Sequence, residues 1–238
     1  MTAEAAKNDW EYFDKIYCIS LKDRIDRQAE AKIQFGKVGL SDKVEFVIVP
    51  KHPHNCEEGI YDSHLACLKS AIQAGAGNVV IFEDDILFDR FSPARLKNCI
   101  DFLSANPDWN ALFFGCLVSS SKRTQNESVL KIKYRCLAHA YALNRRFAET
   151  IIKTPWREIP YDDMLSKHSK NFYAIYPSFA FQSNSRTDNN RNVRLDKIRR
   201  WCGGLWRIQK INEFYHRHLI AVIATHIILI VIILKWIL

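Results

Sequence analysis

Three neighbouring carboxylates, Glu83, Asp84 and Asp85, directly follow the apolar run at 79–82, so acids stand where a buried strand is expected to end. Like charges at this spacing repel one another and hold water. A polar turn would tolerate them, and so would the first turn of a helix, where acids complement the helix dipole. A divalent cation is the functional explanation, because it converts the repulsion into attraction and takes oxygen ligands. The triplet by itself leaves all three explanations open.

The composition is that of one globular domain with an appendage. The chain has 238 residues, of which 48% are hydrophobic, enough apolar material for one sizeable core. Its 8 Gly and 7 Pro are too few for a disordered chain. Seven cysteines without a CxxC pair fit reduced thiols rather than a disulfide framework or structural zinc.

The appendage is the C-terminal stretch at 218–238. Residues 219–234 contain no Asp, Glu, Lys or Arg. About twenty helical residues at ~1.5 Å each nearly cross a ~30 Å hydrocarbon layer. A buried core helix and a helix lying in the membrane plane are the alternatives, but apolar residues occupy every face of this stretch. The sequence therefore predicts a C-terminal transmembrane helix, in which the single His226 is assigned no function.

The positive charge is concentrated just before this predicted span. Residues 186–217 hold nine Lys or Arg against three Asp or Glu, a local charge of 9 − 3 = +6 out of a total of +8. Such a flank stays on the cytoplasmic side and attracts anionic lipid. Aromatic side chains among these charges suit the headgroup level, so we expect membrane lipid rather than nucleic acid as the partner. The first sixteen residues lack the pattern of a secretory signal, which places the rest of the chain in the cytosol.

Short apolar runs alternate with helical patterns through the middle of the chain. Strands are expected at 15–21, 44–50, 78–82, 111–116 and 129–138, helices at 26–39, 63–77 and 93–105, and a polar loop between the last two strands. This alternation predicts an α/β fold with a mainly parallel sheet and helices on both faces. Ligands of such sheets gather at the carboxyl ends of the strands, where the three acids fall.

Five motifs in sequence order resemble glycosyltransferase family 25, which includes bacterial lipopolysaccharide galactosyltransferases and collagen galactosyltransferases. The motifs read IYCISLKDRIDR (16–27), GIYDSHLACLKSAIQAGAGNVVIFEDDILF (59–88), HAYALNRRFAETII (139–152), IPYDDML (159–165) and YAIYPSFAFQ (173–182). The resemblance covers about residues 14–188 and leaves out the basic flank and the predicted span. It implies a GT-A fold, a nucleotide-sugar donor, a divalent metal and inversion at the anomeric carbon. A glycine-cysteine pair common in the family is replaced here by GIYDSH.

The resemblance implies that the acidic triplet is the DXD-like motif of a GT-A enzyme, which holds Mn²⁺ or Mg²⁺ against the diphosphate of the donor. Alternate residues of an extended segment point the same way, so Glu83 and Asp85 can share one site while Asp84 points elsewhere. We expect Asp85 to bind the metal directly and Glu83 to bind it through water or to contact the ribose. Asp84 is assigned to the substrate or to a helix start.

The other motifs supply substrate-binding candidates. Arg24 and Arg27 follow the first strand, where the family binds the nucleotide, although both can instead pair with neighbouring aspartates. Ser63 and His64 open a predicted helix, where their N–H groups can meet a phosphate, or serve as a simple N-cap and a packed histidine.

Three further residues come from the resemblance alone. His139 and Tyr141 are placed at a strand end as substrate contacts, with a core position as the alternative for Tyr141. Asp188 is placed at the edge of the donor site.

Inversion requires a general base that takes the proton of the acceptor hydroxyl. Asp162 occupies the position of the family's PVD aspartate and is the preferred base or acceptor-positioning residue, with Asp163 as the alternative. Two acids in the first turn of a helix are the structural explanation of the same pair.

The sequence thus predicts three segments: a GT-A-like glycosyltransferase domain at 1–188, a basic aromatic juxtamembrane segment at 189–217 and a span at 218–238. The expected reaction moves a hexose, with galactose favoured, from a UDP-sugar to a glycan or membrane-associated acceptor. An inactive GT-A scaffold and a metal-dependent phosphotransferase are the other hypotheses. The DxDx[TV] pattern of phosphoaspartyl enzymes is missing from EDDILF.

Overall fold

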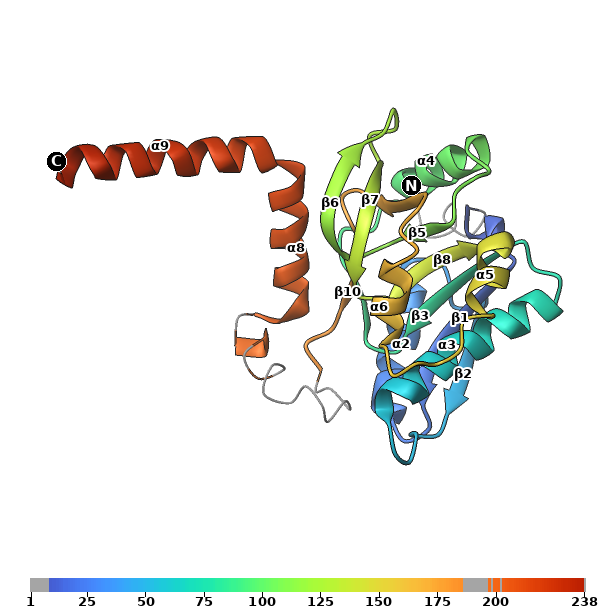
Figure 1. Ribbon diagram of the computed structural model, residues 1–238. Coiled ribbons are helices and arrows are strands. Elements are labelled where there is room, and N and C mark those ends of the chain that lie inside the picture. The colour runs from blue at the N-terminus through green and yellow to red at the C-terminus, as the bar shows by residue number, and fades with distance from the viewer. Residues whose placement is uncertain (1–8, 186–196, 198, 202, 238) are drawn as a thin grey trace.

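A computed structural model describes residues 9–185, 197, 199–201 and 203–237. The described part is an α/β fold built on an eight-stranded sheet in the order β2-β1-β3-β8-β5-β9-β7-β6 (Figure 1). Its strands are β1 (Lys15–Leu21), β2 (Val44–Val49), β3 (Asn78–Glu83), β5 (Ala111–Phe113), β6 (Leu117–Arg123), β7 (Val129–Cys136), β8 (Ala140–Asn144) and β9 (Phe172–Ile175). The short strands β4 (Ile86–Phe88) and β10 (Ala180–Gln182) form a separate antiparallel pair.

The sheet is mixed, with most strands running in one direction. β1 is parallel to β2 and to β3, and β5 is parallel to β9. β8 runs against its two neighbours, as does β7. Six of the eight strands therefore share a direction, and the predicted mainly parallel sheet is confirmed in this sense, interrupted by the two reversed strands.

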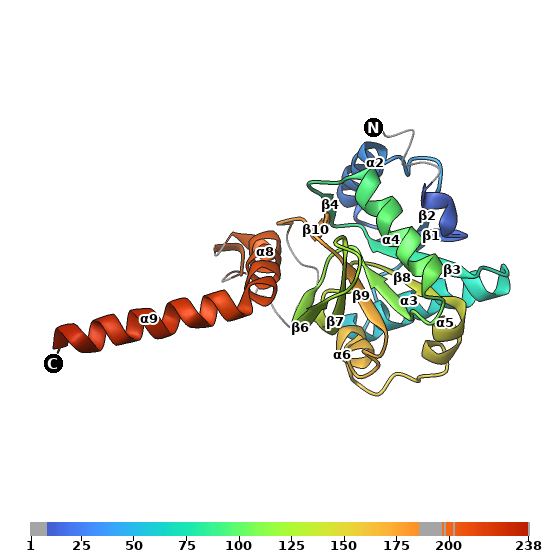
Figure 2. The same ribbon diagram turned by 90° about the horizontal axis from the view of Figure 1, so that it is seen from above.

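Helices cover both faces of the sheet, as predicted. They are η1 (Trp10–Tyr12), α2 (Ile25–Lys37), α3 (Cys56–Gln73), α4 (Pro93–Ala105), α5 (Arg145–Ile151) and α6 (Tyr161–Ser166). Side chains alternate along a strand, so Ile81 packs with α3, α5 and α6 on one face, whereas Val80 and Phe82 pack with α2 and α4 on the other. Figure 2 shows α4 and α6 on opposite sides of the strands.

Two predicted elements differ from the observed ones. The helix expected to begin at Ser63 begins at Cys56, because the Asn55 side chain accepts hydrogen bonds from the backbone N–H groups of Glu57 and Glu58. The polar loop expected between the last two strands contains β6, an edge strand that pairs with β7. Its Ser and Lys side chains are largely exposed, so the apolar alternation that predicts a strand is absent.

Helix α8 (Gly204–Arg217) packs against the edge of this fold. The buried Gln209 side chain donates a hydrogen bond to the backbone oxygen of Ala180 at 2.9 Å. Asn212 pairs with both backbone groups of Val118 at 2.9 and 3.0 Å. The sequence predicts lipid contact for this segment. In the structure one face of α8 packs against the rest of the protein, and Ile211 and Phe214 are exposed on another face.

Helix α9 (Leu219–Ile237) leaves the body of the molecule (Figures 1 and 2). Its window Leu219–Trp236 has a mean hydropathy of 2.6, and none of that window is buried. By length and composition this helix can cross a membrane. The six cysteines that the structure describes are free thiols, as the sequence predicts.

The contact of β10 with the main sheet yields a stability prediction. A methyl group at Gly115 would overlap the backbone oxygen of Ala180 and the Gln209 amide. We expect Gly115→Ala to lower the free energy of unfolding by about 3 kcal/mol, because backbone cannot move aside as a flexible side chain can. Urea denaturation of the detergent-solubilised chain measures this.

Gly36→Ala is the matched control, since Gly36 lies within α2 and its new methyl group would lie 3.4 Å from Ser41 Oγ, which follows the helix. Alanine in a helix interior is neutral or stabilises by up to about 1 kcal/mol. Equal stability of the two variants would contradict the close packing at Gly115.

Candidate functional site

A cleft of about 620 Å³ opens at the carboxyl ends of β1, β2 and β3. Ser20, Val49 and Glu83 line it from these three strand ends. Its other walls come from the first half of α3, the bend at 136–138, the start of α6, the segment at 182–185 and residues 199, 200 and 205. The position agrees with the expectation that ligands gather at the carboxyl ends of the strands.

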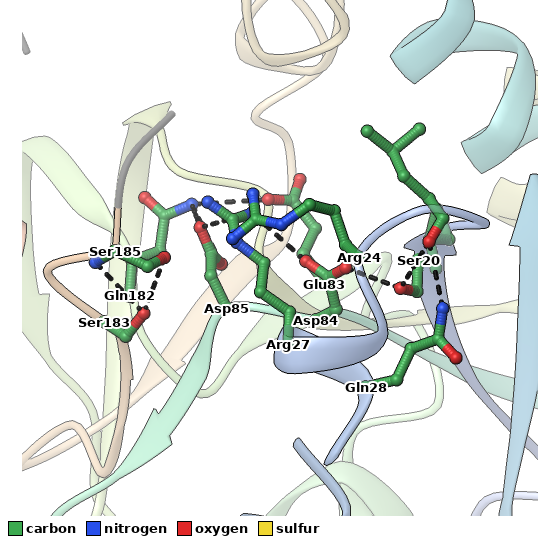
Figure 3. A network of polar contacts seen from close by, with 12 residues as sticks. Ser20, Arg24, Arg27, Gln28, Glu83, Asp84, Asp85, Gln182, Ser183 and Ser185 are labelled. Atoms are coloured by element: carbon green, nitrogen blue, oxygen red, sulfur yellow. Dashed lines mark hydrogen bonds and ion pairs between the residues drawn. The ribbon is translucent and has the colours of Figure 1, made fainter. Parts of the chain in front are cut away.

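Asp84 is the inward-pointing member of the acidic triplet. Its carboxylate accepts a hydrogen bond from Ser20 Oγ at 2.6 Å and one from Arg27 Nη1 at 3.2 Å (Figure 3). All three side chains are largely buried. A buried carboxylate with a hydroxyl and a guanidinium as donors is well compensated, so Asp84 joins β1, α2 and the end of β3.

Glu83 and Asp85 turn together toward a different partner, Gln182 at the end of β10. Gln182 Nε2 lies 3.3 Å from Glu83 and 3.4 Å from both oxygens of Asp85 (Figure 3). Arg27 Nη1 lies 3.8 Å from Asp85 on the other side. Glu83 and Asp85 thus share a partner that Asp84 does not contact, although a turn at Asp84 and Asp85, rather than the expected extended segment, brings them together.

The environment of this pair disfavours its negative charge. Burial, with the nearby Asp162 and Asp84, raises the pKa of Glu83 to about 8. Burial and the neighbouring Glu83 raise the pKa of Asp85 to about 7, against a lowering by Arg27. Carboxylates that resist ionisation in this way gain most from a cation, because a cation would supply the missing opposite charge.

The donor set fits a divalent ion. Two carboxylates and one amide face a common point, and these are the oxygen-bearing groups that Mn²⁺ and Mg²⁺ take. Gln182 Oε1 is buried and has no hydrogen-bond partner among the described residues. Rotation of this amide would exchange its N–H for Oε1 and turn an oxygen toward both carboxylates. In the described part of the chain, no group of three or more His, Cys, Asp or Glu side chains is arranged to hold a metal.

His64 supports Glu83 from inside the fold. Its Nε2 lies 3.4 Å from Glu83 Oε1, and its Nδ1 lies 2.9 Å from the Tyr141 hydroxyl. The ring stacks on Tyr161 with centroids 4.2 Å apart. Burial lowers the pKa of His64 to about 4, so the imidazole is neutral near pH 7. A neutral imidazole has one N–H and one bare nitrogen, so His64 donates to one of these two partners and accepts from the other.

Asp162 and Asp163 both line the cleft but differ in the hydrogen bonds that their carboxylates accept. The Asp162 carboxylate accepts hydrogen bonds from the Tyr134 hydroxyl at 2.6 Å and from the backbone N–H groups of Leu137 and Ala138, both at 2.9 Å. It therefore fixes the bend between β7 and β8. The Asp163 carboxylate has no hydrogen-bond partner within the described residues, and it is the more accessible of the two.

The predicted site residues divide into two groups. Those that line the cleft are Arg27, Ser63, His64, Glu83, Asp84, Asp85, Asp162 and Asp163. Arg24, His139 and Tyr141 are not among the lining residues, and Asp188 lies outside the described residues.

Four of the predicted substrate contacts are buried or bonded within the protein, and of these His139 has no hydrogen-bond partner for its ring nitrogens among the described residues. The Arg24 guanidinium pairs with Asp26 at 2.8 Å, as the alternative for this residue anticipates. Ser63 Oγ donates to the backbone oxygen of Gly59 at 2.6 Å, because Ser63 lies inside α3 rather than at its start. Tyr141 and His139 are fully buried, and Tyr141 reaches the cleft through His64 and through the Tyr161 hydroxyl, which lies 2.8 Å from its own.

Gln182, Ser20 and Tyr161 contribute to the site without having been assigned a role from the sequence. Each lies inside one of the five family-like motifs. Gln182 carries the clearest signal, because a polar amide directly follows the apolar run at 179–181. An amide in that position is also typical of an ordinary strand end, so the contact with Glu83 and Asp85 comes from the tertiary structure.

No protein-family model matches the chain, and no curated protein matches it. Among solved structures it is similar to A197 from STIV, with 14% identity and a TM-score of 0.44 over 71% of this chain and 84% of that one. It is also similar to a UDP-glucose pyrophosphorylase complexed with UDP-glucose, with 12% identity and a TM-score of 0.42 over 75% and 79%. A mannose-1-phosphate geranyltransferase from Thermus thermophilus follows with 8% identity and a TM-score of 0.41 over 69% and 74%. These TM-scores lie below 0.5, and the roles of the residues rest on the geometry of the cleft.

The raised pKa values of Glu83 and Asp85 predict how stability depends on pH. Between about pH 5 and 8 the metal-free folded chain keeps protons that an unfolded chain releases, so this pair lowers the free energy of unfolding as pH rises. His64 and His139, with pKa values lowered to about 4, act in the opposite direction below about pH 6.5. The comparison is therefore between wild type and a variant in which both histidines remain.

We expect the stability of Glu83→Gln relative to wild type to increase by about 1–2 kcal/mol from pH 5 to pH 8 in the presence of a chelator. Urea denaturation at several pH values measures it. The exposed Glu127→Gln is the control and should track wild type. A difference between Glu83→Gln and wild type that stays constant from pH 5 to pH 8 would mean that Glu83 ionises at its ordinary pKa.

Proposed function

We propose that the chain is a metal-dependent glycosyltransferase that moves a hexose from a UDP-sugar to a glycan or membrane-associated acceptor. The observation that carries the proposal is the pair Glu83 and Asp85, set around the Gln182 amide in the wall of a large cleft. The order of the five motifs that resemble glycosyltransferase family 25 supports the same assignment, and it favours inversion and galactose.

The cleft suits a nucleotide sugar in size and polarity. Its volume of about 620 Å³ lies within the range of small-molecule sites. Its walls combine the aliphatic side chains of Ile19 and Val49 with charged groups at the strand ends. Apolar walls serve a base or a sugar ring, whereas the acidic end needs a cation before a diphosphate can approach it.

Glu83, Asp85 and Gln182 would hold Mn²⁺ or Mg²⁺. When bound, such an ion neutralises the diphosphate and stabilises it as a leaving group. The protein holds this ligand set rigidly. Gln182 is carried by β10, which pairs with β4, and Glu83 is contacted from behind by His64. Arg27 and Ser20 anchor Asp84 and so fix the turn that carries its two neighbours.

Activation of the acceptor falls to the pair on α6. The proton of the attacking hydroxyl must go to a carboxylate on the cleft wall during the displacement. Asp163 is the better placed of the two, because the oxygens of Asp162 already accept three hydrogen bonds. We therefore give Asp163 the role of base and Asp162 the role of holding α6 against the bend between β7 and β8.

The position of the cleft relative to a membrane bears on the acceptor. Leu205 at the start of α8 lines the cleft, and α9 follows α8 directly. With α9 in the bilayer and the basic flank on the cytoplasmic side, the cleft lies beside the membrane where nucleotide sugars are made. Acceptors linked to lipid or docked at the membrane fit this arrangement.

The metal assignment predicts the behaviour of Asp85→Asn. We expect this variant to lose Mn²⁺-dependent hydrolysis of UDP-galactose by ~100-fold or more, because a neutral amide replaces a ligand charge. Release of UDP measures it, and the thermal shift given by UDP with Mn²⁺ should disappear in parallel. GDP and CMP serve as competing nucleotides in the same thermal-shift experiment.

Asp101→Asn is the control, since Asp101 is exposed on α4 and pairs with Lys97. It should keep both the hydrolysis and the thermal shift. If hydrolysis by Asp85→Asn depends on Mn²⁺ as in wild type, the acidic triplet does not bind the metal of the donor site. Absence of any nucleotide-induced shift in wild type would instead favour a scaffold without catalysis.

The assignment of the base predicts different defects for the two aspartates on α6. Asp163→Asn should lower transfer from UDP-galactose to water or to simple glycosides by ~10²-fold or more while leaving the UDP-induced thermal shift intact. Asp162→Asn should instead lower the unfolding free energy by about 1–3 kcal/mol, because it leaves buried N–H donors without a full acceptor. The opposite pattern would make Asp162 the base: Asp163→Asn would transfer at the wild-type rate, and Asp162→Asn would lose transfer without losing stability.

A further inference from the structure

A second pocket lies at the opposite end of α8 from the cleft. Its volume is about 580 Å³, and it is formed by the turn between β6 and β7, the first turn of α4 and the last residue of α8. Leu205 at the start of α8 lines the cleft, whereas Arg217 at its end lines this second pocket. None of the residues assigned to the proposed reaction contributes to it.

The charges in this pocket are mostly positive. Three arginines, Arg95, Arg123 and Arg217, line it against the single acid Glu127, a balance of 3 − 1 = +2. Thr124, Gln125 and Ser128 add polar groups to the same wall. A concave site with this excess of guanidinium groups selects an anion, and the planar fork of arginine matches the oxygens of a phosphate.

Two of the arginines are held in place by contacts with the protein. Arg95 Nη1 donates to the backbone oxygens of Arg90 at 3.0 Å and Pro177 at 3.3 Å. The Arg217 guanidinium lies over the Tyr176 ring, 4.9 Å from its centroid. A positioned guanidinium loses less conformational entropy when it binds a ligand than a mobile one does.

Arg123 is the arginine left for a ligand. It is exposed at the end of β6, and its guanidinium has no hydrogen bond or ion pair with any residue that the structure describes. The nearby Glu127 carboxylate likewise has no partner within that part of the chain. An exposed arginine beside two fixed ones is the arrangement in which a phosphate would complete the set of charge-assisted hydrogen bonds.

The pocket also lies where a membrane surface would be. Arg217 ends α8, and the apolar window of α9 begins two residues later at Leu219. Ser121 Oγ lies 3.5 Å from the backbone oxygen of His216, so the end of α8 is held beside β6. Tyr215 is exposed in the same turn. The first residues of a spanning helix lie at the level of the lipid phosphates, and aromatic rings prefer that level.

We propose that this pocket binds the phosphate of an anionic phospholipid in the membrane that α9 enters. The lipid would place its phosphate among the three guanidinium groups and its acyl chains along the base of α9. The site is independent of the reaction in the cleft, and it adds a specific lipid contact to the general attraction of a basic flank.

The test uses the full chain in a neutral detergent and three probes. The probes are dihexanoyl phosphatidylglycerol, the zwitterionic dihexanoyl phosphatidylcholine and inorganic phosphate. The midpoint of thermal unfolding is followed over a concentration series of each, which gives an apparent affinity. We expect phosphatidylglycerol to raise the midpoint at lower concentration than either of the other two.

Arg123→Gln and Arg217→Gln should each weaken this apparent affinity by ~10-fold, the effect of losing one charge-assisted hydrogen bond to phosphate. Arg135→Gln is the matched control, because Arg135 is exposed on β7 outside the pocket and carries the same charge. Arg123 is exposed and makes no contact that the fold needs, so its variant remains informative if Arg217→Gln unfolds.

Three results would overturn the proposal. Equal weakening by Arg135→Gln would mean a response to overall surface charge. Stabilisation by inorganic phosphate at the same concentrations as phosphatidylglycerol would mean a site for a free anion. Absence of any shift with phosphatidylglycerol would mean that the pocket does not bind the headgroup.

Discussion

The ion pair between Arg27 and Asp84 is the contact on which the cleft depends. It joins α2 to the turn after β3, and Ser20 adds the end of β1 through the same carboxylate. Asp84 is used inside the protein, whereas Glu83 at the end of β3 and Asp85 in the turn both face Gln182. A buried charge that keeps its partner is tolerated, whereas removal of either partner leaves an uncompensated charge. The acidic triplet therefore consists of one structural anchor, Asp84, and two carboxylates that face Gln182.

The sequence predicts the fold well where the signal is local. β1 and α4 have the predicted bounds, because an apolar run and a Ser-Pro helix start are each contained within a few residues. The start of α3 is missed because its first turn is polar and Ser63 further along offers a plausible cap. β6 is missed because an exposed edge strand owes its existence to β7, a pairing that no local pattern contains.

In the site, too, the sequence predicts what depends on local pattern better than what depends on tertiary contacts. The order of the strands places Glu83 and Asp85 at a common edge, and α6 brings Asp162 and Asp163 there as well. Sequence reasoning does not separate residues that face the cleft from those that stand behind it. His64 faces the cleft, whereas the buried Tyr141 lies behind it and forms a hydrogen bond with the histidine ring. The contact of Gln182 with Glu83 likewise becomes visible only when β10 is seen beside the end of β3, since the two residues are 99 positions apart in the chain.

The hydrogen bond from Gln209 to Ala180 makes the integrity of the cleft depend on α8, the helix that precedes the apolar α9. Ala180 and Gln182 lie on the same three-residue strand, so α8 supports from outside the strand that carries the amide toward the acids. A shortened, soluble form of the protein that ends at the edge of the family-like region would leave the Ala180 oxygen without its buried donor. One that ends between α8 and α9 keeps that donor and discards only the apolar helix. Helix α8 is in this respect part of the folded body rather than a tether, and a crystallographer or an enzymologist would cut the chain after Arg217.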